Sequence, residues 1–135
     1  MRAPRLHSTI VLAGIIGILS GCSDMGTEPE PAPSPTLPPG QVSFSQNVLP
    51  IFSSAGCTGC HGGNGGLNVG TVQQLMQGGN HGPAVVAGNA NSSVIIQKLS
   101  PNPPFGNRMP QGGPYLSDNT VAVIRAWIDQ GALDN

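Results

Sequence analysis

The sequence predicts an all-α domain of three to four helices joined by long loops. First, apolar residues recur at helical spacing in several short segments. Second, the chain has 20 glycines and 14 prolines, many of them clustered between these segments. Third, a Cys-x-x-Cys-His string is followed at once by glycines, and no strand, crossover and strand pattern surrounds it. Together they favour short helices and glycine- and proline-rich loops arranged around a bound group.

The first expected helix begins at Ser43, whose hydroxyl can cap it. Phe44, Val48 and Phe52 then follow at i, i+4 and i+8 and form an apolar stripe on one face. Pro50 lies inside this pattern and has no amide hydrogen to donate. We therefore expect the helix to be kinked or to restart at Pro50.

Two short helices are expected in the middle of the domain. The first runs over residues 71–77 and stops at Gly78, and the second runs from a Ser92 cap to about Leu99. Residues 101–114 are too rich in proline and glycine to form regular helix. We expect this stretch to wrap around something.

The last helix has the clearest signals. Ser117 can cap its start with Asp118 in the first turn, and Gly131 follows its end. Its apolar face carries Val121, Ile124 and Ile128. Trp127 lies on a neighbouring face and is expected to pack on the first helix or near the bound group.

The N-terminal residues are expected to be an export signal. Arg2 and Arg5 precede an apolar run, Ile10 to Leu19, that is ten residues long, against the roughly 20 needed for a membrane-spanning helix. The run ends in Leu-Ser-Gly-Cys, which resembles the lipobox of bacterial lipoproteins. This resemblance implies a signal peptide over 1–21 and a lipid on Cys22. An ordinary secretory signal with a cysteine near its cut site is the alternative.

Residues 22–40 are expected to be the lipidated cysteine and the proline-rich linker that follows it. They hold six prolines and almost no large apolar residue: Pro29, Pro31, Pro33, Pro35, Pro38 and Pro39. Extended polyproline structure rises about 3.1 Å per residue, so the 18 residues from Ser23 to Gly40 could span roughly 55 Å. The folded domain is then residues 41–135.

Residues 57–61 read Cys-Thr-Gly-Cys-His, the string of covalent c-type haem attachment. The thiols of Cys57 and Cys60 fit on one turn of backbone and can add to the two vinyl groups at one edge of a porphyrin. The imidazole of His61 can then bind the iron as the proximal ligand. A redox-active disulfide and a zinc site completed by His81 are the alternatives.

Three side chains compete to be the sixth iron ligand. Met109 lies in the irregular loop before Pro110, which biases it toward extended backbone. His81 is flanked by glycine and could also reach the iron, whereas Met76 lies in a helical apolar pattern and fits a core position. We predict Met109 as the ligand, with His81 as its rival and an open site as a third alternative.

Composition narrows the possible partners. Residues 41–135 carry three positive and three negative side chains: Lys98, Arg108, Arg125, Asp118, Asp129 and Asp134. No basic patch is present, so no nucleic-acid partner is expected. The chain has three cysteines, of which one is assigned to the lipid and two to the haem. No disulfide framework is therefore expected.

Several ordered motifs carry a family resemblance. They are Phe44-Ser45, Val48-Leu49-Pro50-Ile51-Phe52, the CTGCH string, Gly66-Leu67, Ser92-Ser93-Val94, Arg108-Met109-Pro110, Tyr115-Leu116-Ser117 and Trp127-Ile128-Asp129-Gln130-Gly131-Ala132. In this order they resemble a class I monohaem cytochrome c of the planctomycete type. The resemblance implies one covalent haem, with Cys57 and Cys60 at the thioether positions and His61 and Met109 as axial ligands.

We therefore expect a membrane-tethered electron carrier, exported and lipid-anchored, with its haem domain in the periplasm or at the cell surface. Its partners would be redox proteins, a donor and an acceptor. A haem-based small-ligand sensor or a redox enzyme subunit, with an open or His-ligated sixth position, is the alternative. Enzyme activity is not expected, because apart from His81 and Arg108 few polar residues could serve catalysis at haem.

Overall fold

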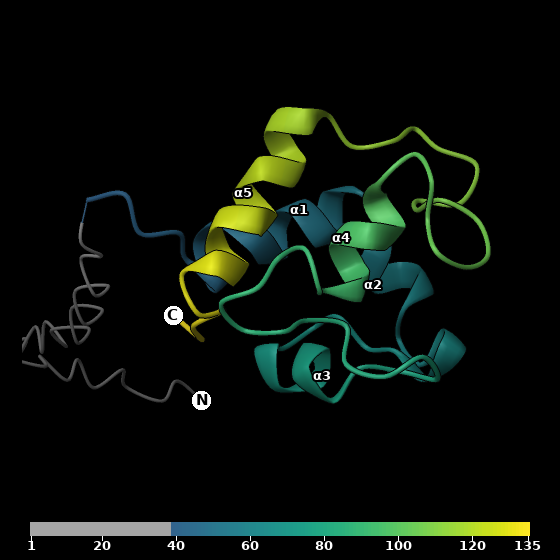
Figure 1. Ribbon diagram of the computed structural model, residues 1–135, viewed down its shortest axis with the longest axis horizontal. Coiled ribbons are helices and arrows are strands. Elements are labelled where there is room, and N and C mark those ends of the chain that lie inside the picture. Colours follow the sequence, from purple (N-terminus) through teal and green to yellow (C-terminus); the bar gives the residue numbers. More distant parts are fainter. Residues whose placement is uncertain (1–38) are drawn as a thin grey trace, which may run out of the picture. The chain divides into compact units, whose positions relative to one another are not determined.

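The computed structural model describes residues 39–135 (Figure 1). The predicted signal peptide, Cys22 and nearly all of the predicted linker lie outside the described residues, so the expectations about them stay predictions. Between residues 39 and 135 no helix is long and apolar enough to cross a membrane. The elements are η1 (Phe44–Val48), α1 (Leu49–Ser54), α2 (Cys57–Cys60), η2 (Asn64–Gly66), α3 (Val72–Gln77), α4 (Val94–Leu99) and α5 (Asp118–Asp129).

The described residues form an all-α domain, as predicted. They contain five α-helices and, instead of strands, two isolated bridges, Gly62 with Asn68 and Gly79 with Gly82. Three to four helices were expected. The count is higher because the first helix is followed by a separate four-residue helix, α2, formed by the CTGC residues themselves.

The first helix changes its hydrogen-bond register at Pro50. Ser43 caps it, with its hydroxyl accepting from the Gln46 amide at 3.0 Å. The turns before the proline are wide, since the amide of Val48 donates to the Ser43 carbonyl and that of Leu49 to Phe44. Ordinary α-helix begins at Leu49, with Pro50 in the first turn. The predicted restart is thus confirmed, as a π-helical segment that passes into α1.

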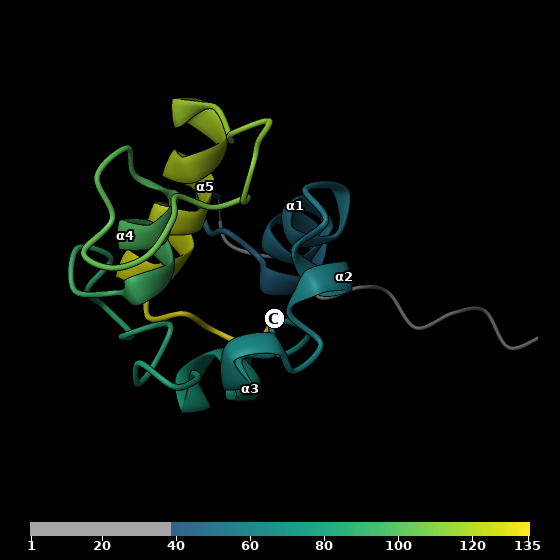
Figure 2. The same ribbon diagram turned by 90° about the vertical axis from the view of Figure 1, so that its right-hand side faces the viewer.

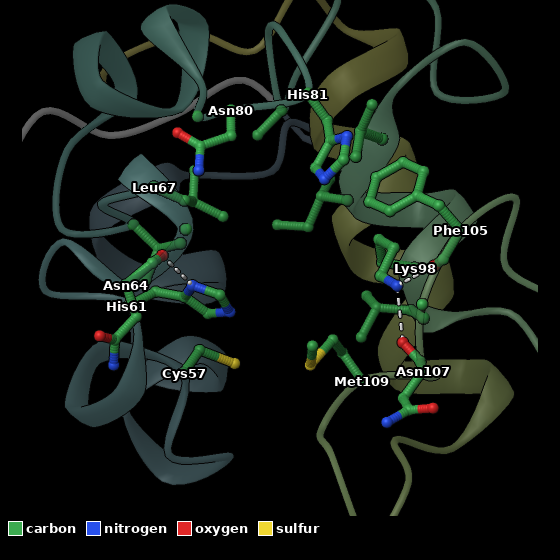
Figure 3. Close-up of a pocket in the computed structure, with 18 of the residues that line it drawn as sticks. Cys57, His61, Asn64, Leu67, Asn80, His81, Lys98, Phe105, Asn107 and Met109 are labelled. Atoms are coloured by element: carbon green, nitrogen blue, oxygen red, sulfur yellow. Dashed lines mark hydrogen bonds between the residues drawn. The ribbon is translucent and has the colours of Figure 1, made fainter.

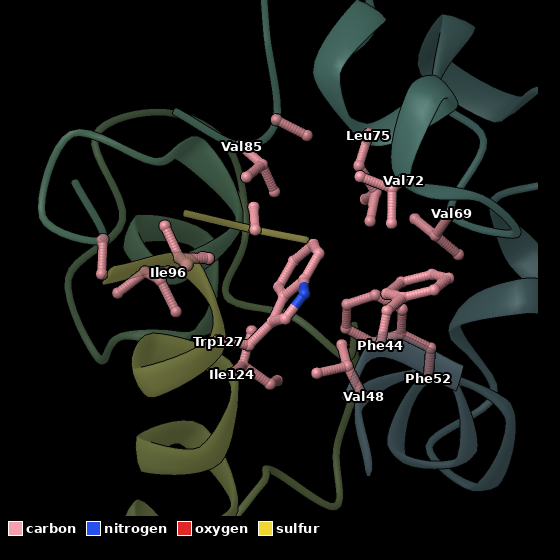
Figure 4. Close-up of a cluster of buried hydrophobic side chains, with 14 of the residues drawn as sticks. Phe44, Val48, Phe52, Val69, Val72, Leu75, Val85, Ile96, Ile124 and Trp127 are labelled. Carbon is pink, nitrogen blue, oxygen red and sulfur yellow. The ribbon is translucent and has the colours of Figure 1, made fainter. Parts of the chain in front are cut away.

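The hydrophobic core lies where η1 crosses α5. The rings of Phe44 and Trp127 are 5.3 Å apart between centroids (Figure 4), and the Trp127 indole nitrogen donates to the Leu133 carbonyl at 2.9 Å. This confirms the first of the two positions expected for Trp127. The other fully or nearly fully buried apolar residues are Val48, Phe52, Val69, Leu75, Val85, Ala90, Ile96, Ile124 and Ile128.

The predicted cap of the middle helix was wrong by one residue. The helix cap is Ser93, not Ser92, and α4 begins at Val94. Ser93 is buried, and its hydroxyl donates to the Asn89 carbonyl at 2.9 Å and accepts from the Val86 amide at 2.9 Å. This serine therefore ties the preceding loop to α4 and does not cap the free amides of the helix.

This arrangement gives the domain two walls, one that contains α1 and α2 and one that contains α4 and α5 (Figure 2). In Figure 2, α1 and α2 lie on one side of the domain, α4 and α5 lie on the other, and α3 lies below them. The loop after α3 contacts η2, which follows α2, and the Asn80 amide donates there to the Gly65 carbonyl at 2.9 Å. Glycine is needed in this loop, because Gly78 has a φ of +72° and a Cβ there would overlap the Gly82 carbonyl.

Candidate functional site

A cavity of about 290 Å³ lies between the two walls (Figure 3). The cavity is mainly apolar, with only a few polar side chains around it. The apolar lining residues are Phe52, Leu67, Val69, Ala84, Val94, Ile95, Leu99, Phe105, Met109 and Leu116. A cavity of this kind, with few polar groups, suits a large apolar ligand.

Cys57 reaches the cavity from the first residue of α2. Gly56, with a φ of +74°, turns the chain from α1 into α2. The Cys57 side chain is half-buried and lines the cavity (Figure 3). Burial raises the pKa of the Cys57 thiol above its ordinary value, and the nearby Cys60 adds to the rise while a backbone hydrogen bond opposes it. The free thiol is therefore harder to ionise than an ordinary cysteine.

Cys60 is exposed and is not among the residues that line the cavity. It lies three residues after Cys57 on the same short helix, and residues at this spacing share one face. Both thiols are free. The structure therefore brings Cys57 into the cavity lining and leaves Cys60 outside it.

His61 directly follows α2, and its imidazole lies beside Cys57 in the cavity wall. Its Nδ1 is 3.3 Å from the carbonyl oxygen of Asn64. A proton on Nδ1 would be donated to this oxygen, which leaves the lone pair of Nε2 free for a metal. In Figure 3 this second nitrogen points into the space between the walls.

Asn64 is a residue that the sequence analysis missed. Its side-chain amide donates to the Cys60 carbonyl at 2.7 Å, and its own carbonyl faces the His61 ring. It thus closes the turn that follows the CTGCH string. Its position three residues after His61, among four glycines, is the signal that could have identified it.

Met109 lies on the opposite wall. Its side chain is half-buried and lines the cavity, with its sulfur directed toward the side that carries Cys57 and His61 (Figure 3). Its amide donates to the Lys98 carbonyl at 2.8 Å, which fixes the loop against the end of α4. Met76 does not line the cavity and packs against the core.

His81 also lines the cavity, although its side chain is exposed. Its ring stacks on Phe105, with 4.0 Å between the centroids. The two candidates for a sixth ligand are thus both at the cavity, and Met76 is not. For the zinc alternative, no three His, Cys, Asp or Glu side chains anywhere in residues 39–135 converge so that they could hold a metal ion.

These residues fit a covalently bound haem. Apolar walls can cover the porphyrin faces, a thiol lies in one wall, and an imidazole nitrogen and a thioether sulfur face the cavity from opposite sides. Nitrogen and thioether donors are the axial ligands of cytochromes c. An all-α fold with this donor set is what a small c-type cytochrome domain requires.

Residues 57–111 match the family model described as Planctomycete cytochrome C. The matched segment begins at Cys57 and extends just past Met109. The predicted resemblance to a planctomycete-type cytochrome c domain is therefore confirmed over residues 57–111, and this family implies covalent haem c. No curated protein and no solved structure matches the chain.

Proposed function

We propose that this c-type cytochrome is a membrane-tethered carrier of single electrons, with one haem ligated by His61 and Met109. The observation that carries the proposal is the opposition of these two side chains across the apolar cavity. When bound, haem supplies a one-electron couple between ferric and ferrous iron. Two protein ligands on the iron would keep its coordination nearly the same in the ferric and ferrous states, which suits electron transfer.

The protein residues have separate tasks in this proposal. Cys57 and Cys60 would each hold the haem through a thioether, formed by addition of a thiol S–H across a vinyl group with no leaving group. The Asn64 carbonyl holds the imidazole of His61 in the orientation that leaves Nε2 available. The thioether sulfur of Met109 favours the ferrous state and raises the reduction potential relative to a second imidazole.

Visible spectroscopy of the purified protein tests both parts of the ligation. A pyridine haemochrome spectrum reports the thioether bonds, and a ferric charge-transfer band reports thioether ligation of the iron. We expect two thioether bonds and the charge-transfer band. Absence of the band, with thioether bonds present, would contradict the assignment of Met109.

A haem-based sensor of small ligands is the second candidate, favoured by His81 at the cavity edge. In that case the sixth position would be open or held by a readily displaced imidazole. Carbon monoxide distinguishes the two functions, because it binds ferrous iron only where a coordination position opens. The carrier predicts that the ferrous wild-type protein stays inert to the gas.

The proposed tether rests on the sequence of the N-terminal residues alone. Cys22 would carry the lipid, and the proline-rich linker would let the haem domain search for donor and acceptor proteins near the membrane. Metabolic labelling with a radioactive fatty acid tests this. We expect the label on the wild-type protein and no label on Cys22→Ser, while Cys22→Ser keeps its haem.

A further inference from the structure

We propose that Lys98 is a positioning residue that holds the loop of Met109 so that the thioether faces the cavity. The inference rests on the proposed function, because it concerns how the sixth ligand is kept in place. Lys98 is also the only lysine in residues 41–135. It lies on α4, whose other residues are Val, Ile, Ile, Gln and Leu.

The ammonium of Lys98 binds two carbonyl groups of the loop that precedes Met109. It donates to the carbonyl of Phe105 and, at 2.6 Å, to that of Asn107 (Figure 3). Hydrogen bonds from a charged donor are stronger than those between neutral groups. The side chain thus fixes the loop at two points, four and two residues before the proposed ligand.

The backbone of Lys98 forms a third hydrogen bond with the same loop. Its carbonyl accepts from the amide of Met109 at 2.8 Å. One residue of α4 therefore contacts the loop both at Met109 itself and in the turn before it. These contacts set where the loop leaves α4 and where the methionine side chain starts.

An aromatic ring extends the contact to the other loop at the cavity. The Lys98 ammonium lies 4.7 Å from the centroid of the Phe105 ring, and His81 stacks on that ring at 4.0 Å. A cation near an aromatic ring is attracted to it. Lys98 thus organises the Met109 loop and, through Phe105, the edge of the cavity that carries His81.

Loss of these contacts should raise the population of states in which the loop has moved and the sixth position is open. The test uses the full-length, haem-loaded protein in its ferric form and imidazole as the probe, because imidazole can bind only after the protein ligand has left. In Lys98→Met the imidazole binding rate should rise about tenfold or more, which equals about 1.4 kcal/mol of opening free energy. The ferric charge-transfer band should weaken in parallel.

Two variants separate positioning from charge. Arg125→Met also removes one positive charge, but Arg125 donates to Asn91 from α5 and does not line the cavity. Its imidazole binding rate should stay within about twofold of wild type, because a partly exposed charge outside the cavity lining contributes little. Lys98→Arg keeps the charge and can donate to both carbonyls, so it should largely restore the slow binding.

The outcomes decide the proposal separately from the function. If the wild-type protein shows the charge-transfer band and Lys98→Met binds imidazole at the wild-type rate, Lys98 has no positioning role. If Arg125→Met speeds binding as much as Lys98→Met does, the effect is one of charge and the inference is also wrong. A wild-type protein without the band would instead contradict Met109 ligation.

Should Lys98→Met fail to take up haem, Lys98→Gln serves in its place. This variant keeps a polar side chain, but the chain is shorter and has no charge to bind the carbonyls of Phe105 and Asn107. Faster imidazole binding than in the wild-type protein would support the inference. An unchanged rate would overturn it.

Discussion

The two walls of the haem cavity are built in different ways. The wall that carries His61 is held by contacts within a few residues: the imidazole faces the carbonyl of Asn64, and the amide of His61 donates to the Cys57 carbonyl at 2.7 Å. The wall that carries Met109 is held by α4. Met109 bonds to Lys98, eleven residues earlier in the chain, and Arg108 bonds to Leu99, nine residues earlier. Local sequence therefore specifies the first ligand, and packing between elements specifies the second.

This difference bears on which ligand can leave. On the His61 side a short helix and a tight turn fix the imidazole, and the proposed thioether bonds add a covalent restraint. On the Met109 side the restraints are hydrogen bonds, those of Lys98 and one from the Arg108 side chain to the Leu99 carbonyl at 2.8 Å. We expect ligand exchange to occur on the Met109 side.

The largest effect is expected from removal of both thioether cysteines. Cys57→Ala/Cys60→Ala should lack haem and should be poorly folded, because this small, glycine-rich domain is built around an apolar cavity that the porphyrin would fill. Near-ultraviolet circular dichroism measures this loss of fixed packing. Cys22→Ser, which removes the third cysteine, is the matched control and should keep the native signal. A native-like spectrum from the double variant would show that the two walls pack without haem.

Replacement of the proposed sixth ligand should have the next largest effect. Met109→Ala should lower the reduction potential by on the order of 100 mV, because loss of the thioether removes a donor that favours ferrous iron. It should also let carbon monoxide bind. A redox titration and a carbon monoxide difference spectrum measure the two changes.

His81→Ala is the control for this experiment. It removes the other candidate ligand at the cavity and should leave the potential and the inertness to carbon monoxide unchanged. The assignment would be wrong if His81→Ala changed both properties and Met109→Ala changed neither.

A smaller effect is expected on the His61 side. Asn64→Ala removes the side-chain bond to the Cys60 carbonyl but keeps the backbone carbonyl that faces His61. A single hydrogen bond contributes about 0.5–1.5 kcal/mol, so denaturant unfolding should show a loss in that range. Imidazole binding should stay near the wild-type rate. If Asn64→Ala speeds imidazole binding more than Lys98→Met does, the contrast between the walls is wrong.

The smallest effect is expected from salt. Residues 41–135 hold three positive and three negative side chains, so no strong net field steers a partner toward either wall. Electron transfer with a physiological donor or acceptor should therefore change little between low and moderate ionic strength. Stopped-flow measurements test this, and a rate that falls about tenfold would reveal local steering that the balance of charges hides.

Local signals explain how much of the fold could be predicted. Ser43 and Ser117 cap the first and last helices as expected, because a cap needs only its own neighbours. The cap of α4 was predicted one residue too early. Ser93 bonds to Val86 and Asn89, and these contacts depend on how the preceding loop folds back onto the helix. The π-helical form of the first helix was foreseen only as a break at Pro50.

The candidate site likewise has residues that the local sequence identifies and one that it does not. Cys57, Cys60 and His61 could be identified because their chemistry lies in five consecutive residues. Lys98 could not be identified in this way, because its partners are the backbone carbonyls of Phe105 and Asn107. Every residue type has a backbone carbonyl, so the sequence does not show such a contact. A lone lysine on an apolar helix is the one signal that could have drawn attention to it.

Intact-mass spectrometry of the matured protein under denaturing conditions tests the central claim most directly. Both walls are interpreted as the two sides of one covalently attached haem, so the polypeptide should carry the mass of a single haem after unfolding. The Cys57→Ala/Cys60→Ala variant should carry none. Bare polypeptide from correctly matured wild-type protein would contradict the account.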